Sequence, residues 1–170
     1  MKTGEQSIGM PAVLVFNASA GIKGTASALS VDDLAADLNT NLMAPMKAAQ
    51  FVLPGMRRAN YGTILFTGGG IAVKPQADMA SGSIGKCALR QLALLLHHEL
   101  TPENIHVATV TVSRFVQRDE ILEHYACRRA LRAFKQAFQA KKTLDPDYIA
   151  EYYWKLHKQT PPIWDAEIQL

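Results

Sequence analysis

The sequence is poor in cysteine, nearly balanced in charge and without a long hydrophobic run, and each of these absences excludes a class of protein. Its two cysteines, Cys87 and Cys127, lie too far apart for a Cys-x-x-Cys metal or redox motif, and we expect both to be reduced thiols. The net charge of +3 over 170 residues is too small to indicate a nucleic-acid-binding surface. The first apolar run, residues 12–16, is too short for a signal peptide or a membrane span. We therefore expect a cytoplasmic protein that binds neither nucleic acid nor a membrane.

Three short runs rich in β-branched residues alternate with stretches long enough for helices. The runs cover residues 12–16, 63–67 and 105–112, and their spacing is typical of strands joined by helical crossovers. Such alternation predicts an α/β fold with a parallel sheet. Because 48% of the residues are hydrophobic, we expect the 170 residues to form one domain with its own core.

Two long helices are predicted between these runs. The first should begin after Ser30, a residue whose hydroxyl can cap the first turn, and Pro54 should end it or kink it. Its inward face is predicted to consist of Leu34, Leu38, Leu42, Met46, Ala49 and Val52. The second helix covers residues 81–100 and is apolar on most sides. We expect one side of it to lie on the sheet and the other to form a homo-oligomer contact.

The remaining chain divides into a basic segment and a final helix. Residues 117–142 are predicted to be a helical excursion whose arginines and lysines, without aromatic stacking residues beside them, are more typical of a solvated surface than of a nucleic-acid site. Over residues 143–170, Asp145 and Pro146 predict the start of a last helix. Its aromatic residues, Tyr148, Tyr152, Tyr153 and Trp154, are expected to serve packing rather than ligand binding.

The first strand stands unusually near the start of the chain. A run without polar alternation is typical of the middle of a parallel sheet, yet only about 10 residues precede residues 12–16, too few for a flanking βαβ unit. We expect an exposed apolar edge and a chain that is incomplete at its N-terminus. The alternative is that another subunit or polypeptide covers this edge.

Several segments carry a family resemblance. The first strand is followed by Asn17-Ala18-Ser-Ala-Gly21, the next helix contains Asn39-Thr-Asn41-Leu, and the second helix begins Ser81-Gly-Ser-Ile-Gly-Lys86. Together these resemble the short-chain dehydrogenase/reductase family over residues 11–116. The resemblance implies that Asn17, Ala18 and Gly21 line the adenine side of a site for NAD or NADP.

Asn41 is the candidate for the catalytic asparagine of that family. Pro45 has no N–H to donate to the carbonyl of residue 41, so that carbonyl is released from the helix ladder and the helix should kink there. The resemblance implies that the backbone of Asn41 binds a water linked to the active-site lysine. Taken without the family, Asn41 is an ordinary residue of a helix surface.

Lys86 matches the lysine of the family's Tyr-x-x-x-Lys pattern, but the tyrosine is absent. A phenol four residues before a lysine lies one turn away, where the ammonium lowers the phenol pKa for proton transfer. Position 82 is Gly82, and the position that matches the catalytic serine is Gly69, so neither hydroxyl is present; Thr67 is the nearest one. The resemblance implies that Lys86 binds the nicotinamide ribose. The alternative is a structural lysine that extends from its helix.

The resemblance implies further cofactor contacts, but at these positions the sequence departs from the family pattern. Thr67 and Gly68 end the second strand, and Val116 follows the third in the place of the family's turn beside the nicotinamide, although Ser113 and Arg114 replace the Pro-Gly of that turn. No Gly-x-x-x-Gly-x-Gly motif follows a strand near the N-terminus, so the phosphate-binding part of the site is missing from the sequence. No metal site is expected.

The sequence thus predicts a partial, doubly wound Rossmann-like sheet that lacks its first βαβ units. Its catalytic candidates are Asn41 and Lys86. Its activity would be hydride transfer between NAD or NADP and an unknown carbonyl or alcohol, impaired or abolished by the loss of both hydroxyls. Two alternatives stay open: a non-catalytic interaction protein that dimerises through residues 81–100, and a gene fragment without a function of its own.

Overall fold

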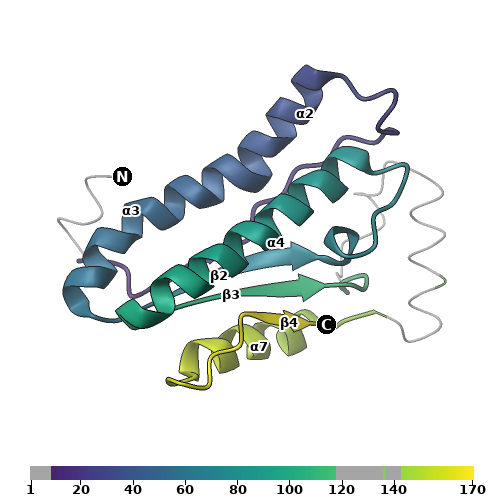
Figure 1. Cartoon of the computed structure of the whole chain (residues 1–170). Coiled ribbons are helices and arrows are strands. Elements are labelled where there is room, and N and C mark those ends of the chain that lie inside the picture. Colours follow the sequence, from purple (N-terminus) through teal and green to yellow (C-terminus); the bar gives the residue numbers. More distant parts are fainter. Residues whose placement is uncertain (1–8, 118–135, 137–142) are drawn as a thin grey trace.

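Four parallel strands form the centre of the molecule, in the order β1-β2-β3-β4 (Figure 1). The structure is a computed structural model, and it describes residues 9–117, 136 and 143–170. The strands are β1 (Val13–Phe16), β2 (Gly62–Gly69), β3 (Ile105–Val112) and β4 (Glu167–Gln169). The prediction of an α/β fold with a parallel sheet is confirmed, as are its first three strands. β4 was not predicted, since its three residues carry no apolar run.

The helices cover both faces of this sheet. They are α2 (Val31–Leu38), α3 (Ala44–Ala59), α4 (Ala80–Leu100) and α7 (Pro146–Lys158), joined by a π-helix, η1 (Asn39–Met43), and by the 3-10 turns η2 (Gly70–Ala72) and η3 (Thr101–Glu103). Figure 1 shows α3 and α4 on one side of the sheet and α7 on the other. The basic excursion predicted over residues 117–142 lies outside the described residues, except for residues 117 and 136.

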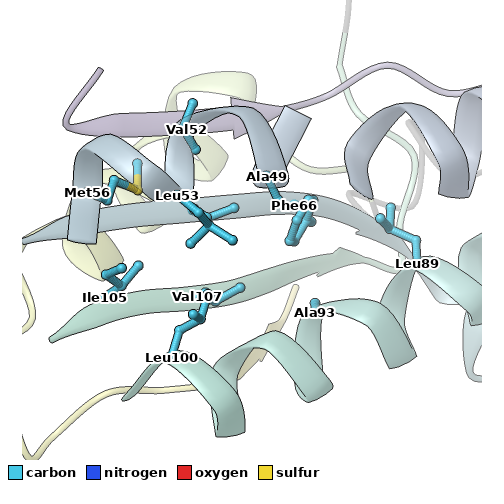
Figure 2. Packing of buried hydrophobic residues seen from close by; sticks show 11 residues of the cluster. Ala49, Val52, Leu53, Met56, Phe66, Leu89, Ala93, Leu100, Ile105 and Val107 are labelled. Carbon is cyan, nitrogen blue, oxygen red and sulfur yellow. The ribbon is translucent and has the colours of Figure 1, made fainter. Parts of the chain in front are cut away.

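The larger core lies between the sheet and the α3–α4 layer (Figure 2). Alternate residues of β2 divide between the two faces: Phe66 contacts α3 and α4, whereas Leu65 contacts the α7 layer. In the larger core Phe66 is fully buried beside Leu89, Leu100 and Val107. Because each such side chain contributes about 1.5–3 kcal/mol on burial, this layer is the main source of the hydrophobic stability of the described fold.

The first predicted helix is divided into three pieces by its proline. Ser30 caps α2 as predicted, with its hydroxyl accepting from the N–H of Asp33 at 3.0 Å. Before Pro45 the chain forms the π-turn η1, in which the N–H of Ala44 bonds the carbonyl of Asn39 five residues back. The α-helical bonding pattern thus changes to a π-turn just before the proline at which the sequence predicted a kink. Pro54, in contrast, lies inside α3, which continues to Ala59.

The extra residue of the π-turn also changes which side chains face inward. The buried positions along this helix run through Asp37, Asn41 and Pro45 before reaching Ala49 and Val52, which were predicted correctly. The prediction that Met46 faces inward was wrong, because its side chain is 39% exposed. A regular spacing counted through residues 34–52 cannot account for the rotation that a π-turn introduces.

The final helix begins where the sequence indicated. Asp145 caps α7 by accepting from the N–H of Asp147 at 2.8 Å, and Pro146 occupies the first turn. Tyr152 and Tyr153 pack against the smaller core, as expected. Trp154 does not, since it is 62% exposed.

Within the described residues β1 is an edge strand that pairs only with β2. Its side chains Leu14 and Phe16 pack on the larger core, but Val13 and Val15 are 36% and 49% exposed on the other face. The expected exposed apolar edge is therefore present. No helix in residues 9–117 and 143–170 is long and apolar enough to cross a membrane.

Candidate functional site

The residues singled out from the sequence gather where the parallel strands end. Asn17 and Ala18 follow β1, Thr67 and Gly68 lie at the end of β2, and Val116 follows β3. Parallel strands present their carboxyl ends at the same edge of the sheet, and in doubly wound folds this edge is where ligands bind. Asn17, Ala18 and Gly21 are exposed there, and Val116 is half-buried.

Asn41 holds the loop that follows β1. Its side chain is fully buried; Nδ2 donates to the carbonyl of Ala20 at 2.7 Å, and Oδ1 accepts from the N–H of Ala20 at 3.1 Å. The hydroxyl of Ser19 donates to the same Oδ1 at 3.4 Å. A loop held by a paired backbone contact has little freedom to move, so Asn41 sets the position of the segment that contains Asn17, Ala18 and Gly21.

A second polar group supports the same loop. Asp37, 5% exposed, accepts from the N–H of Ile22 at 2.8 Å and from the hydroxyl of Ser81 at 2.5 Å. The Ser81 hydroxyl also lies 3.2 Å from the carbonyl of Ile22. Asp37 thereby joins α2, α4 and the loop through one buried carboxylate. Sequence analysis did not identify it, although it lies four residues before Asn41 on the same helical side.

Lys86 lies at the end of β2 with its ammonium buried. The residue is 7% exposed, and Nζ donates to the carbonyl of Thr67 at 2.8 Å. Burial lowers the pKa of the Lys86 ammonium, because removing a cation from water favours its neutral form. The structure therefore brings together Lys86 and Thr67, two residues that the sequence analysis named separately as cofactor contacts.

The hydroxyl of Thr67 is directed elsewhere. It forms a 2.6 Å hydrogen bond with the phenol of Tyr153 in α7, on the other face of the sheet from α4. Burial raises the pKa of the Tyr153 phenol, while the bond to Thr67 acts in the opposite direction. Since this hydroxyl already has a partner, it does not replace the missing serine. Tyr153 was expected only to pack, and its bond to the strand end had no signal in the sequence.

The two positions without hydroxyls, Gly69 and Gly82, flank one apolar side chain. A Cβ added at Gly82 would lie 3.3 Å from Cδ1 of Ile71, and one added at Gly69 would lie 3.9 Å from Cγ1 of Ile71 and 3.7 Å from Cγ of Lys86. Both positions thus have room for a side chain, and Ile71 stands between them. The hydroxyl of Ser83, one residue further along, accepts from the N–H of Gln76 at 3.3 Å and is 6% exposed.

Metal ligands do not assemble in this part of the protein. Within the described ranges, 9–117 and 143–170, no three His, Cys, Asp or Glu side chains gather in a group that could hold a metal ion.

Comparison with known proteins relates this arrangement to a family. Residues 2–116 match the family model described as short chain dehydrogenase. Human 17-beta-hydroxysteroid dehydrogenase type 1 is 35% identical over 100 residues, which are 58% of this chain and 30% of the human protein.

Two solved structures share the fold over 99% of this chain. One is a short-chain dehydrogenase from Streptomyces avermitilis, with a TM-score of 0.79, 21% identity and 63% of its own length covered. The other is L-sorbose reductase from Gluconobacter frateurii, solved with NADPH and L-sorbose, with a TM-score of 0.84, 20% identity and 68% covered. The chain thus spans 30% of the human relative and about two thirds of these structures. The family match over residues 2–116, on a parallel sheet that these structures share, shows that the chain belongs to the short-chain dehydrogenase/reductase family.

Proposed function

We propose that this chain binds the nicotinamide end of NAD or NADP at the carboxyl edge of its sheet, and that its hydride transfer to or from a carbonyl or alcohol is impaired. The observation that carries the proposal is the surroundings of Lys86. A buried ammonium stands at the end of β2, and the two neighbouring positions that would supply hydroxyls are Gly69 and Gly82.

The residues present fit the nicotinamide ribose and the adenine side of a dinucleotide better than its diphosphate. Lys86 offers an ammonium that could donate to the hydroxyls of the nicotinamide ribose, and Asn41 holds the loop whose Asn17 and Ala18 would face the adenine side. The bound nicotinamide would supply or accept the hydride. Because the sequence has no glycine-rich loop for the diphosphate, we expect binding to be weak.

Proton transfer is the step for which the tyrosine and serine hydroxyls of the family are missing. Reduction of a carbonyl requires a proton at the oxygen as well as a hydride at the carbon, and an acid placed within hydrogen-bond reach supplies it. Position 82 has no side chain, the Thr67 hydroxyl bonds Tyr153, and the Ser83 hydroxyl is far less acidic than a phenol. Activity, where it is measured, should therefore be low at neutral pH.

The experiment is an NADPH fluorescence titration beside a thermal melt of the same sample. A folded chain that binds NADPH saturably, and whose Lys86→Ala variant does not, would support the proposal. Lys47, exposed on α3, provides the matched control, because Lys47→Ala removes the same charge from a solvent-exposed position. A folded wild-type chain without binding would refute cofactor binding, and undiminished turnover by Lys86→Ala would refute the assigned role.

A second variant tests the missing part of the site. Gly69→Ser combined with Gly82→Tyr would restore both hydroxyls; a Cβ at position 69 makes only ordinary contacts, and one at position 82 requires a small movement of the flexible end of Ile71. We expect this double variant to remain a poor NADPH oxidase, because the diphosphate cradle is still lacking. Rapid NADPH oxidation by it would show that the chain holds the cofactor without a glycine-rich loop.

An interaction role is the second candidate, favoured by the outer side of α4. Ile84 and Leu95 are 42% and 66% exposed and lie eleven residues apart, three helical turns, so both face the same direction. We propose that this side binds a second copy of the chain. Light scattering should show a dimer that Leu95→Lys converts to a monomer, whereas Val31→Lys, at an 81% exposed apolar residue of α2, leaves it intact. A wild-type monomer would contradict this role.

A further inference from the structure

One residue of β2 connects the two helical layers through polar contacts. The carbonyl of Thr67 accepts from Nζ of Lys86 in α4 at 2.8 Å, and its hydroxyl bonds the phenol of Tyr153 in α7 at 2.6 Å. These helices pack on opposite faces of the sheet, in separate hydrophobic cores. Thr67 is thus in contact with a buried cation on one side and a half-buried phenol on the other.

The position of Thr67 in the strand makes its side chain important for the strand end. Pairing between β1 and β2 ends at Phe16 and Phe66, so Thr67 is the first residue of β2 beyond the end of β1. The three residues that follow, 68–70, are all glycine. Residues 67–69 of β2 pair with residues 110–112 of β3 along one edge, and among these three residues of β2 only Thr67 has a side chain that packing on the sheet faces can hold.

The bond between Lys86 and the Thr67 carbonyl depends on the orientation of the Thr67 peptide. The ammonium of Lys86 is desolvated, and the Thr67 carbonyl compensates it by accepting a charge-assisted hydrogen bond. A small rotation of the Thr67 peptide would lengthen this bond and favour the neutral amine. The bond from Tyr153 opposes that rotation, because rotation would stretch a 2.6 Å hydrogen bond to a phenol whose ring packs against the smaller core.

We propose that Tyr153 is a positioning residue for Lys86 and acts through Thr67: its bond to the Thr67 hydroxyl holds the carbonyl that stabilises the Lys86 ammonium at the strand end. This inference rests on the proposed function in that it assigns α7 a part in preparing the lysine for the cofactor. It concerns the ionisation of Lys86, which can be measured without any ligand.

The test is the titration of the Lys86 side-chain nitrogen by NMR in the full chain labelled with nitrogen-15 lysine. The signal is assigned by its disappearance in Lys86→Arg. We expect Tyr153→Phe to lower the titration midpoint by about half a pH unit or more, which is about a threefold change in proton affinity. Tyr152→Phe is the matched control, because Tyr152 lies in the same helix and bonds Tyr148 instead of Thr67.

Two variants of Thr67 separate positioning from general damage to the fold. Thr67→Val keeps the size of the side chain without its hydroxyl and should lower the midpoint as Tyr153→Phe does, while Thr67→Ser should keep it near the wild-type value. Thermal melts identify any variant that is unfolded. If Tyr153→Phe does not fold, Thr67→Val supplies the test, because it removes the same hydrogen bond from the other side.

The outcomes distinguish this inference from the proposed function. An unchanged Lys86 midpoint in both Tyr153→Phe and Thr67→Val would overturn it, as would an equal change in Tyr152→Phe. A lowered midpoint in both, with Thr67→Ser near wild type, would support it. Failure of the wild-type chain to bind NADPH would refute the proposed function and leave the midpoint result intact.

Discussion

Adding one methyl group at each of two glycines in α4 should change stability in opposite directions. A Cβ at Gly85 would lie 2.8 Å from Nδ2, 2.9 Å from Cβ and 3.1 Å from Cγ of Asn41. Asn41 is fully buried and tied by two bonds to Ala20, so it has no free rotation by which to make room. A Cβ at Gly82 would meet only Cδ1 of Ile71, the end of a flexible side chain, at 3.3 Å.

The magnitudes follow from these contacts. Overpacking at a rigid site costs about 1–3 kcal/mol, and each hydrogen bond lost when Asn41 is displaced costs about 1 kcal/mol. Replacing glycine by alanine inside a helix returns up to about 1 kcal/mol of backbone entropy. We expect Gly85→Ala to lower the free energy of unfolding by about 2 kcal/mol and Gly82→Ala to leave it unchanged or raise it by up to about 1 kcal/mol.

Urea denaturation followed by circular dichroism measures both differences, with an unchanged denaturant slope as the check on two-state unfolding. Because Asn41 holds the loop after β1, Gly85→Ala should also increase proteolysis within residues 17–22. Equal midpoints for the two variants would refute the argument, since it depends wholly on Asn41 packing against position 85 and not against position 82.

The other predictions concern charged and titratable groups. Burial lowers the pKa of Lys86 in the folded chain below its usual 10.5, so the unfolded chain binds more protons and stability should rise with pH up to about 10.5; Lys86→Met should remove this rise and increase the thermal midpoint at neutral pH. Burial likewise lowers the pKa of His106, and stability should fall as the pH drops below about 6.5, a slope that His106→Gln should flatten in urea titrations. Arg90 holds the pKa of Glu167 low through a 2.6 Å pair in which both side chains are partly buried. The stability from this pair should be present above about pH 4.5 and lost as the pH falls further, and Arg90→Ala should cost about 1–2 kcal/mol at neutral pH and flatten that acid dependence. A full acid slope in Arg90→Ala would contradict the assignment.

Features that depend on neighbouring residues were predictable from the sequence. Ser30 and Asp145 cap their helices because a short oxygen-bearing side chain can reach the free N–H groups of its own first turn. The interruption before Pro45 follows from a missing donor, and the three long strands follow from β-branched runs. The family motifs likewise brought Asn41 and Lys86 to attention.

What could not be predicted depends on contacts between distant segments. Asp37 is buried because a loop 15 residues away and Ser81 in α4 supply its hydrogen bonds. β4 exists as a strand because the edge of β3 provides its partners, since three residues of low apolar content have no strand tendency of their own. Tyr153 meets Thr67 across 86 positions of the chain.

Local chemistry thus specified where the helices and strands begin and which family motifs they carry. Only the packed sheet decided which polar groups are desolvated and paired, because burial and partner distance are properties of the assembled layers. Lys86 illustrates the two contributions. Its place in a helix could be predicted from the sequence, but its buried bond to the Thr67 carbonyl, and the bond of Thr67 to the Tyr153 phenol, come from the tertiary structure alone.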